Sequence, residues 1–103
     1  AIRFAVRSME LVGGRRRFDG YVALGCVIRG ETSHYEHVCR EAIRGVNDLS
    51  LEYSLATGIG ILTGDTHDQA VKRAAASGVN KGGAAAEAAM AMIEVKRSFL
   101  PPR

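Results

Sequence analysis

Tyr21-Val-Ala-Leu-Gly-Cys-Val-Ile28 is a continuous apolar run that includes β-branched residues. A short run of this kind predicts a strand buried on both faces, as in a parallel sheet covered by helices. The run leads into Arg29-Gly30-Glu31-Thr32-Ser33. Ser33-His34-Tyr35-Glu36 then has the pattern of a capping box, with serine at the N-cap and glutamate three residues later. We therefore expect a strand, a turn and a helix that begins at about His34.

The same strand-turn-helix pattern occurs a second time. Thr57-Gly-Ile-Gly-Ile-Leu-Thr63 is another short apolar run, and the turn Gly64-Asp65 leads into a second capping box, Thr66-His67-Asp68-Gln69. The helix is expected to run from about His67 to Ala76 and to end at Ser77-Gly78, where glycine can adopt the left-handed C-cap conformation. Gly58 and Gly60 lie inside this run. Because glycine weakens a strand, we expect another backbone or a ligand to come close to them.

Helical periodicity marks three further segments. One is Ile2 to Val12, which Gly13 and Gly14 end. Another is the helix after Ser33, and the third is an alanine-rich stretch from about Ala84 to Arg97. The second helix has an apolar stripe opposite a charged face; the stripe comprises Val38, Ala42, Val46, Leu49 and Tyr53, and the charged face Arg40, Glu41, Arg44 and Asp48.

Two strands alternating with four helices predict an α/β fold. Sheets usually have about four to six strands, so either neighbouring chains complete the layer or upstream strands are absent from this chain. With 103 residues, the chain is large enough for one domain and too small for two. A domain of this size buries a modest share of its surface and gains stability from association.

The composition excludes several classes of protein. The net charge is +3, aromatic residues make up 6% and tryptophan is absent, which argues against a nucleic-acid binder. No apolar run is long enough for a membrane span, and the first residues lack a signal-peptide pattern. Cys26 and Cys39 are too few for a disulfide framework and favour a reducing, cytoplasmic compartment.

The segment from Arg29 to His34 follows the carboxyl end of the first strand, where open α/β sheets bind ligands. Its glycine and hydroxyl groups and the following helix N-terminus are suited to a phosphate, although an ordinary capped loop has the same pattern. The helix dipole favours a neutral imidazole at His34, which would suit a general acid or base, and the alternative is a surface histidine without a role. His37 has no further metal ligand near it in sequence, so we predict no metal site.

Two other cations are candidates. Arg73 lies in the middle of the third helix, and Lys81 lies in the glycine-rich stretch Asn80-Lys81-Gly82-Gly83 before the last helix. Both are the kind of residue that an ordinary surface carries. Lys81 is the more suggestive, because the adjacent glycines permit close backbone approach just before a helix N-terminus.

Together these segments resemble 6,7-dimethyl-8-ribityllumazine synthase, a transferase of riboflavin biosynthesis. The resemblance runs from about Phe18 to Val95. It is carried by Tyr21 to Glu36, by Gly60-Ile-Leu-Thr63 with the helix through Gln69-Ala70, and by Arg73 followed by Asn80-Lys81-Gly82. It implies a flavodoxin-like, three-layer α/β/α fold with a parallel sheet. Residues 1–103 would then form a single partial domain that lacks the N-terminal strands.

The resemblance further implies the penultimate step of riboflavin synthesis. In this step, 5-amino-6-(D-ribitylamino)uracil condenses with 3,4-dihydroxy-2-butanone 4-phosphate through an imine, without a cofactor. The family forms pentamers or multiples of pentamers with active sites between adjacent subunits. A non-catalytic shell-forming or flavin-related ligand-binding protein of the same fold is the alternative.

The resemblance assigns roles to individual residues. His34 corresponds to the proton-transfer histidine. Cys26, Val27 and Ile28 correspond to contacts with the pyrimidine and ribityl chain. Glu31, Thr32 and Arg73 correspond to the phosphate site, with the arginine supplied by the adjacent subunit, and Lys81 corresponds to a lysine near the same pocket.

This chain departs from the family pattern in three places. Ile59 stands where a phenylalanine commonly packs on the pyrimidine, and an aliphatic side chain still covers a ring face. Ala84 stands where an acidic residue is common, so a hydrogen bond from that position is not expected. The upstream strands that carry a ring-stacking aromatic and a pyrimidine-binding segment have no counterpart before Ala1, and we expect the isolated 103-residue chain to be inactive or very weak.

Overall fold

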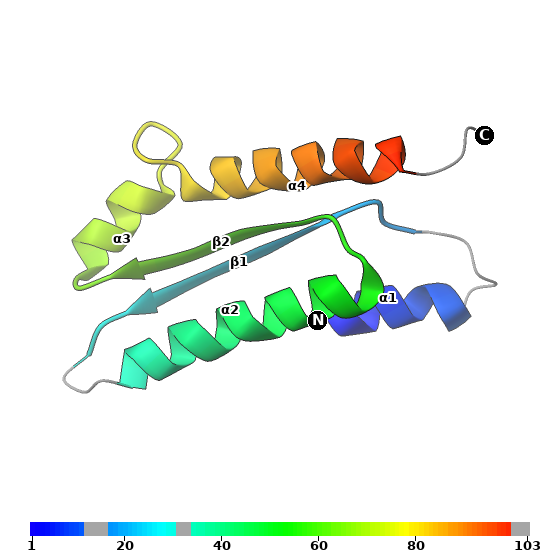
Figure 1. Cartoon of the computed structure of the whole chain (residues 1–103). Helices are drawn as coiled ribbons and strands as arrows, with labels where there is room; N and C mark the ends of the chain where they lie inside the picture. The colour runs from blue at the N-terminus through cyan, green and yellow to red at the C-terminus, as the bar shows by residue number, and fades with distance from the viewer. Residues whose placement is uncertain (12–16, 31–33, 100–103) are drawn as a thin grey trace.

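The protein has the α/β architecture that the sequence predicts. A computed structural model describes residues 1–11, 17–30 and 34–99. The elements follow one another as α1 (Ile2–Leu11), β1 (Tyr21–Ile28), α2 (His34–Tyr53), β2 (Thr57–Gly64), α3 (His67–Ala74) and α4 (Lys81–Ser98). Helices α1 and α2 lie on one face of the sheet and α3 and α4 on the other (Figure 1). The three layers agree with a flavodoxin-like fold.

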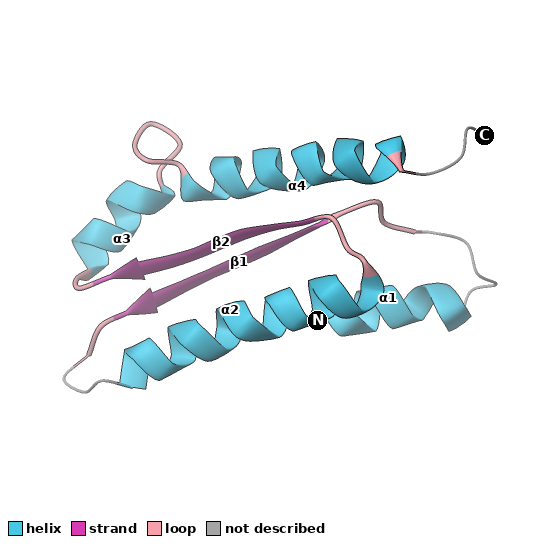
Figure 2. Cartoon of the chain, viewed as in Figure 1, coloured by secondary structure: helices cyan, strands magenta, loops and turns pink. Residues whose placement is uncertain are grey.

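The two strands pair in parallel along their whole length. Tyr21 lies opposite Thr57 at one end of the ladder and Ile28 lies opposite Gly64 at the other. Beyond the strand, the Arg29 N–H donates to the Gly64 carbonyl at 2.8 Å. Both arrowheads therefore end at the same edge of the sheet, close to the first turns of α2 and α3 (Figure 2). This carboxyl edge is where an open α/β sheet presents its loops to a ligand.

The glycines within β2 are explained by the close approach of α4. A Cβ atom on Gly58 would collide with the backbone of Ala85, and one on Gly60 would lie 3.1 Å from the Ala85 Cβ. Ala85 and Ala89 are buried at this contact. The small side chains on both elements let the helix axis come near the sheet, so the expectation of a close backbone is confirmed.

Strand β1 is not buried on both faces, and that prediction was wrong. Leu24 is 68% exposed, and Val22 and Ile28 are 41% and 40% exposed. Leu24 lies on the face that carries α4, because its Cδ2 atom is the neighbour that a Cβ on Gly60 or Gly82 would meet. Helix α4 packs mainly over β2 and contacts β1 to a smaller extent, so the described residues cover this face of β1 only in part.

The segment between α3 and α4 also differs from the prediction. Helix α3 ends at Ala74, and its C-cap residue, Ala75, is extended with φ −62° and ψ 133°. Gly78 is not a left-handed cap; the glycine is required because a Cβ there would come within 2.4 Å of the Lys72 carbonyl oxygen. The left-handed residue is Asn80, the N-cap of α4, which lets α4 begin at Lys81 rather than at Ala84.

Helix α2 has the predicted orientation with less burial than expected. Its apolar stripe is half-buried from Ala42 onward and Val38 is 38% exposed, whereas the predicted charged face is exposed. No residue of α2 is fully buried. The capping serine before this helix, the glycines after α1 and the prolines after α4 lie outside the described residues.

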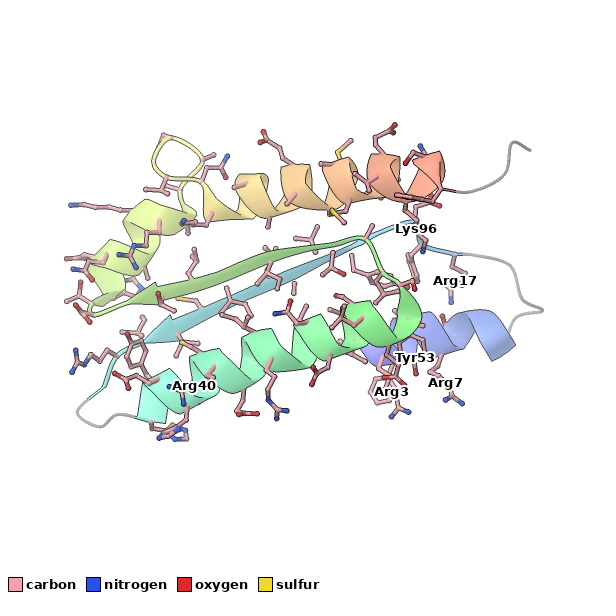
Figure 3. All side chains as sticks on the ribbon, in the orientation of Figure 1. Arg3, Arg7, Arg17, Arg40, Tyr53 and Lys96 are labelled. Atoms are coloured by element: carbon pink, nitrogen blue, oxygen red, sulfur yellow. The ribbon has the colours of Figure 1, made fainter. Side chains whose placement is uncertain are left out.

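Two side-chain contacts hold the opposite end of the molecule, where both strands begin. Arg3 of α1 lies beside Tyr53 at the end of α2 (Figure 3), and their hydrogen bond raises the pKa of the Arg3 guanidinium. Lys96 of α4 donates to the Ser54 carbonyl at 2.7 Å, which joins the last helix to the turn before β2. Throughout the described ranges, none of the helices combines the length and the hydropathy that a membrane crossing requires.

Candidate functional site

The loops that follow the two strands meet at the carboxyl edge of the sheet. Arg29 follows β1 and Asp65 follows β2, and their side chains form an ion pair of 3.8 Å between Nη1 and Oδ1. Both side chains are more than half exposed, so the pair contributes little to stability. Together with the backbone bond from Arg29 to Gly64, it links the start of the Arg29 to His34 segment to the turn after β2.

The turn after β2 is built by the second predicted capping box. Thr66 Oγ1 accepts a hydrogen bond from the Gln69 N–H at 3.2 Å, as predicted. The Gln69 side chain reaches one residue further back than in a standard capping box, because its Oε1 accepts from the Asp65 N–H at 2.8 Å. These two bonds fix the direction in which α3 leaves the sheet, and therefore the position of Arg73 on its last turn.

Arg73 points back to the end of β2. Its Nη1 atom donates a hydrogen bond to the Thr63 carbonyl oxygen. The bond uses one corner of a planar, five-donor guanidinium and leaves other N–H groups available in a fixed orientation. Arg73 is half-buried, so its charge lies beside the strand end rather than free in solvent.

A cavity of about 510 Å³ lies along the outer edge of β2. Helices from both faces of the sheet contribute to the wall of this cavity, and all of its strand residues belong to β2. The cavity therefore lies at the edge of β2 that does not pair with β1. Three of the predicted site residues, Ile59, Arg73 and Lys81, line it together. The remaining lining residues are Ile43, Gly60, Ile61, Leu62, Thr63 and Val79.

The chemistry of this cavity is amphipathic. Arg73 and Lys81 supply two cations and Thr63 supplies a hydroxyl group, whereas the isoleucines and Val79 form an apolar wall. Such a lining suits a ligand that has both a phosphate or other anion and a flat or aliphatic body.

A second cavity, of about 410 Å³, lies over both strands on the face that carries α3 and α4. Cys26 lines it together with a largely apolar set, Leu24, Gly25, Gly60, Leu62, Ala74 and Gly82. Cys26 is an exposed free thiol. Gly60 and Leu62 line both cavities, so the two spaces are neighbours at β2.

The other predicted site residues lie at the end of β1 and the start of α2. Val27 is half-buried opposite Thr63, and Ile28 ends the strand opposite Gly64. His34 is the first residue of α2 and is exposed. Glu31 and Thr32, predicted to bind phosphate, lie outside the described residues.

The structure therefore places the predicted residues in two groups. The first follows β1 and comprises Cys26, Val27, Ile28 and His34. The second surrounds the outer edge of β2 and comprises Ile59, Arg73 and Lys81. Among the described residues, no group of three or more His, Cys, Asp or Glu side chains is placed to hold a metal ion.

Three features of the site were not predicted. Thr63 orients Arg73 through its carbonyl oxygen, Gly60 forms part of both cavities, and Asn80 shapes the chain beside Lys81. The asparagine before a Lys-Gly-Gly stretch is the one available sequence signal, because asparagine tolerates left-handed backbone and caps helices. A bond to a backbone carbonyl ten residues away leaves no trace in the sequence.

Comparison with known proteins gives a consistent match. The family model described as 6,7-dimethyl-8-ribityllumazine synthase matches residues 2–97. A relative of that name from Afipia carboxidovorans is 53% identical over 102 residues, which cover 99% of this chain and 61% of the relative.

Two other relatives of the same name agree. The protein from Paramagnetospirillum magneticum is 44% identical over 99 residues, covering 96% of this chain and 66% of its own. The protein from Bartonella tribocorum is 54% identical over 82 residues, covering 80% of this chain and 54% of its own. The chain thus spans between 54% and 66% of the length of these curated relatives.

Proposed function

This chain belongs to the 6,7-dimethyl-8-ribityllumazine synthase family, and on that premise we propose that the whole protein is a lumazine synthase. It condenses 5-amino-6-(D-ribitylamino)uracil with 3,4-dihydroxy-2-butanone 4-phosphate, the penultimate step of riboflavin synthesis. The 5-amino group of the uracil forms an imine with the ketone and releases one water, and inorganic phosphate leaves in a later elimination. The ribitylamino nitrogen then attacks the carbonyl that this elimination produces, and loss of a second water closes the ring. The reaction uses no cofactor.

The observation that carries this proposal is the cavity at the outer edge of β2. It combines Arg73 and Lys81 with an apolar wall that includes Ile59, which is the combination that a phosphorylated sugar-like substrate and a pyrimidine require. A dianionic phosphate is best held by a guanidinium in a fixed orientation, and the bond from Arg73 to the Thr63 carbonyl supplies that orientation. Glu31 and Thr32 would complete the phosphate site.

His34 is the proposed general acid and base. Imine formation and phosphate elimination both require proton transfer at the uracil amine and the butanone carbons, and a histidine titrates close to neutral pH. His34 begins α2 and follows, in sequence, the residues proposed to bind phosphate. Cys26, Val27 and Ile28 would form the floor for the pyrimidine and ribityl chain.

The complete site is proposed to lie between adjacent subunits of a homo-oligomer, a pentamer or a multiple of it. The two groups of residues support this, because one follows β1 and the other faces outward from the edge of β2. The burial pattern supports it as well: in the described part of the chain the buried apolar residues are Val6, Ala56, Ala70, Ala85 and Ala89. A radius of gyration of 15.8 Å exceeds the roughly 13 Å of a compact chain this long.

Two further proposals concern the setting of the chain. Residues 1–103 are proposed to act as one domain, since α4 and α2 pack on the same pair of strands. The protein is proposed to work in the cytoplasm, because its two cysteines are free and suit a reducing compartment.

The test uses the full-length protein, both substrates and the fluorescence of the lumazine product. Wild-type protein is expected to form product, and His34→Ala is expected to lower kcat by about a hundredfold, as loss of a general acid or base does. His37→Ala is the matched control, since His37 is an exposed histidine one turn along the same helix. Tight binding of a substrate analogue without turnover by the wild type would instead identify a non-catalytic carrier. Equal kcat values for His34→Ala and wild type would remove His34 from its role.

A further inference from the structure

Asn80 has an unusual backbone conformation beside the cavity of about 510 Å³ along the outer edge of β2, which we call the β2-edge cavity. Its φ and ψ are 51° and 57°, in the left-handed region. Among the described non-glycine residues, only Ser54 shares a positive φ. The conformation is unfavourable for residues with a Cβ atom, although asparagine tolerates it better than most. The chain therefore keeps this conformation because the surrounding contacts require it.

Three hydrogen bonds hold Asn80 in place. Its N–H donates to the Ala75 carbonyl at 3.2 Å, and its own carbonyl accepts from the Ala84 N–H at 3.1 Å. Its Oδ1 atom accepts from the Gly83 N–H at 3.1 Å, which caps α4. One residue thereby connects the end of α3 to the first turn of α4.

The glycines around Asn80 are adapted to these contacts. A Cβ atom on Gly83 would lie 2.4 Å from the Asn80 Nδ2 atom, so the side chain fills the space that a larger residue would need. A Cβ atom on Gly78 would lie 2.4 Å from the Lys72 carbonyl oxygen. The connection therefore approaches both helices closely at these two glycines.

The residues on either side of Asn80 both line the cavity. Val79 precedes it and Lys81 follows it, and Arg73 lines the same space from the last turn of α3. A change of the Asn80 backbone from left-handed to an ordinary helical or extended conformation would rotate Lys81 relative to Val79 and Arg73. Two cations repel each other, so the backbone at residue 80 limits how far Lys81 can turn away from the cavity that it shares with Arg73.

We propose that Asn80 is a positioning residue whose left-handed conformation holds the Lys81 ammonium beside the Arg73 guanidinium, so that both cations contact one phosphate group. This inference rests on the proposed lumazine synthase function and extends it to a residue that does not itself contact substrate. The asparagine side chain stabilises the conformation through the cap, and the conformation places the lysine.

The test compares two substitutions at Asn80 in the full-length protein. Asn80→Gly removes the side-chain cap but still adopts the left-handed conformation, whereas Asn80→Ala disfavours it. For Asn80→Ala we expect the KM for the butanone phosphate, and the inhibition constant of inorganic phosphate, to rise roughly tenfold, the value of one charge-assisted contact. For Asn80→Gly we expect a change of no more than about threefold, since glycine is nearly as good an N-cap as asparagine. The KM for the uracil substrate should change little in either variant.

Ser50→Ala is the control for a loss of stability alone. The Ser50 hydroxyl lies 2.9 Å from Thr57 Oγ1 at the start of β2, at the opposite end of the strand from Thr63, and neither Ser50 nor Thr57 lines the cavity. Thermal unfolding of all variants shows whether they are folded and how far each is destabilised. If Ser50→Ala loses as much stability as Asn80→Ala and keeps the wild-type phosphate KM, the effect at Asn80 is one of positioning.

Two results would overturn the inference, and they are distinguishable. If wild-type protein turns over and Asn80→Ala keeps the wild-type inhibition constant for phosphate, the positioning role is wrong while the proposed function stands. The same holds if Asn80→Gly and Asn80→Ala weaken phosphate binding equally, because then the cap and not the backbone conformation matters. If wild-type protein makes no product, the function fails and the inference fails with it.

Discussion

Gly58 of β2 lies directly against Ala85 of α4: a Cβ atom on Gly58 would collide with the Ala85 carbonyl oxygen and would lie 3.1 Å from the Ala89 nitrogen. No side-chain rotation relieves such a contact, because the neighbouring atoms belong to the helix backbone. The distance between α4 and the sheet is thus determined by a glycine. The same helix carries Lys81 at its first position, so this contact also bears on the candidate site.

Gly58→Ala is expected to lower the free energy of unfolding by about 3 kcal/mol, at the upper end of the cost of overpacking a tight contact. The measurement is urea denaturation of the full-length protein. Gly45→Ala is the matched control, because a Cβ on Gly45 of α2 meets nothing within 4 Å. That variant should gain up to about 1 kcal/mol from the higher helix propensity of alanine. Equal stabilities for the two variants would show that α4 does not pack on Gly58 as described.

Arg73→Gln is expected to raise the KM for the butanone phosphate by at least about tenfold, because a guanidinium–phosphate contact is charge-assisted and often bidentate. Lys72→Gln removes the same unit of charge from the neighbouring position of α3, and Lys72 is exposed. In steady-state kinetics, the KM of Lys72→Gln for the butanone phosphate should therefore stay within about twofold of the wild-type value, because a screened surface charge has a small effect. Similar KM values for both variants would mean that net charge, and not the Arg73 site, attracts the phosphate.

Ile59→Phe is expected to tighten binding of the uracil substrate. Ile59 lines the β2-edge cavity, and an aromatic ring stacked on a pyrimidine adds about 0.5–1.5 kcal/mol beyond its buried area. The KM for the uracil should fall about two- to tenfold, whereas the KM for the butanone phosphate serves as the internal control and should not change. A higher KM for the uracil would indicate that the cavity has no room for a ring at this position.

The Glu41–Arg44 pair of α2 predicts a small pH dependence of stability. The hydrogen bond from Arg44 lowers the pKa of the Glu41 carboxyl below its ordinary value. A depressed folded-state pKa means that the contribution is complete above the pKa of the unfolded chain and is lost as pH falls through the folded-state pKa. Glu41→Gln should be less stable than wild type near pH 7. The difference should vanish at strongly acidic pH in denaturant titrations, and a difference independent of pH would exclude the ion pair as its cause.

Much of the secondary structure was predictable because its signals are local. Strand β1 has the predicted bounds, and β2 is one residue longer than predicted. The second capping box forms because the Thr66 hydroxyl and the Gln69 side chain accept hydrogen bonds from backbone N–H groups no more than four residues away. The end of α3 and the start of α4 were not predictable in the same way. The left-handed conformation of Asn80 depends on bonds to Ala75 and Gly83 that form only when both helices are in place.

The candidate site was likewise predictable only in part. Residue types and motif order, through the family resemblance, were enough to name His34, Arg73 and Lys81 as candidate site residues, and their roles stay predictions. They could not reveal that Ile59, Arg73 and Lys81 share one cavity, because these residues come from a strand and two helices. The bond from Arg73 to the Thr63 carbonyl likewise joins a side chain to a strand end across the turn.

Local pattern was sufficient for the α/β class, the parallel strands and the family, because each depends on short-range periodicity, capping and motif order. Burial was decided only by packing. The apolar run of β1 predicted a strand covered on both faces, yet Leu24 is 68% exposed because α4 lies over β2. Hydrophobicity states how much a side chain gains from burial, whereas the position of a neighbouring helix decides whether that burial takes place. In this protein a pair of glycines in β2 lets α4 pack closely on that strand, and α4 covers β1 only in part.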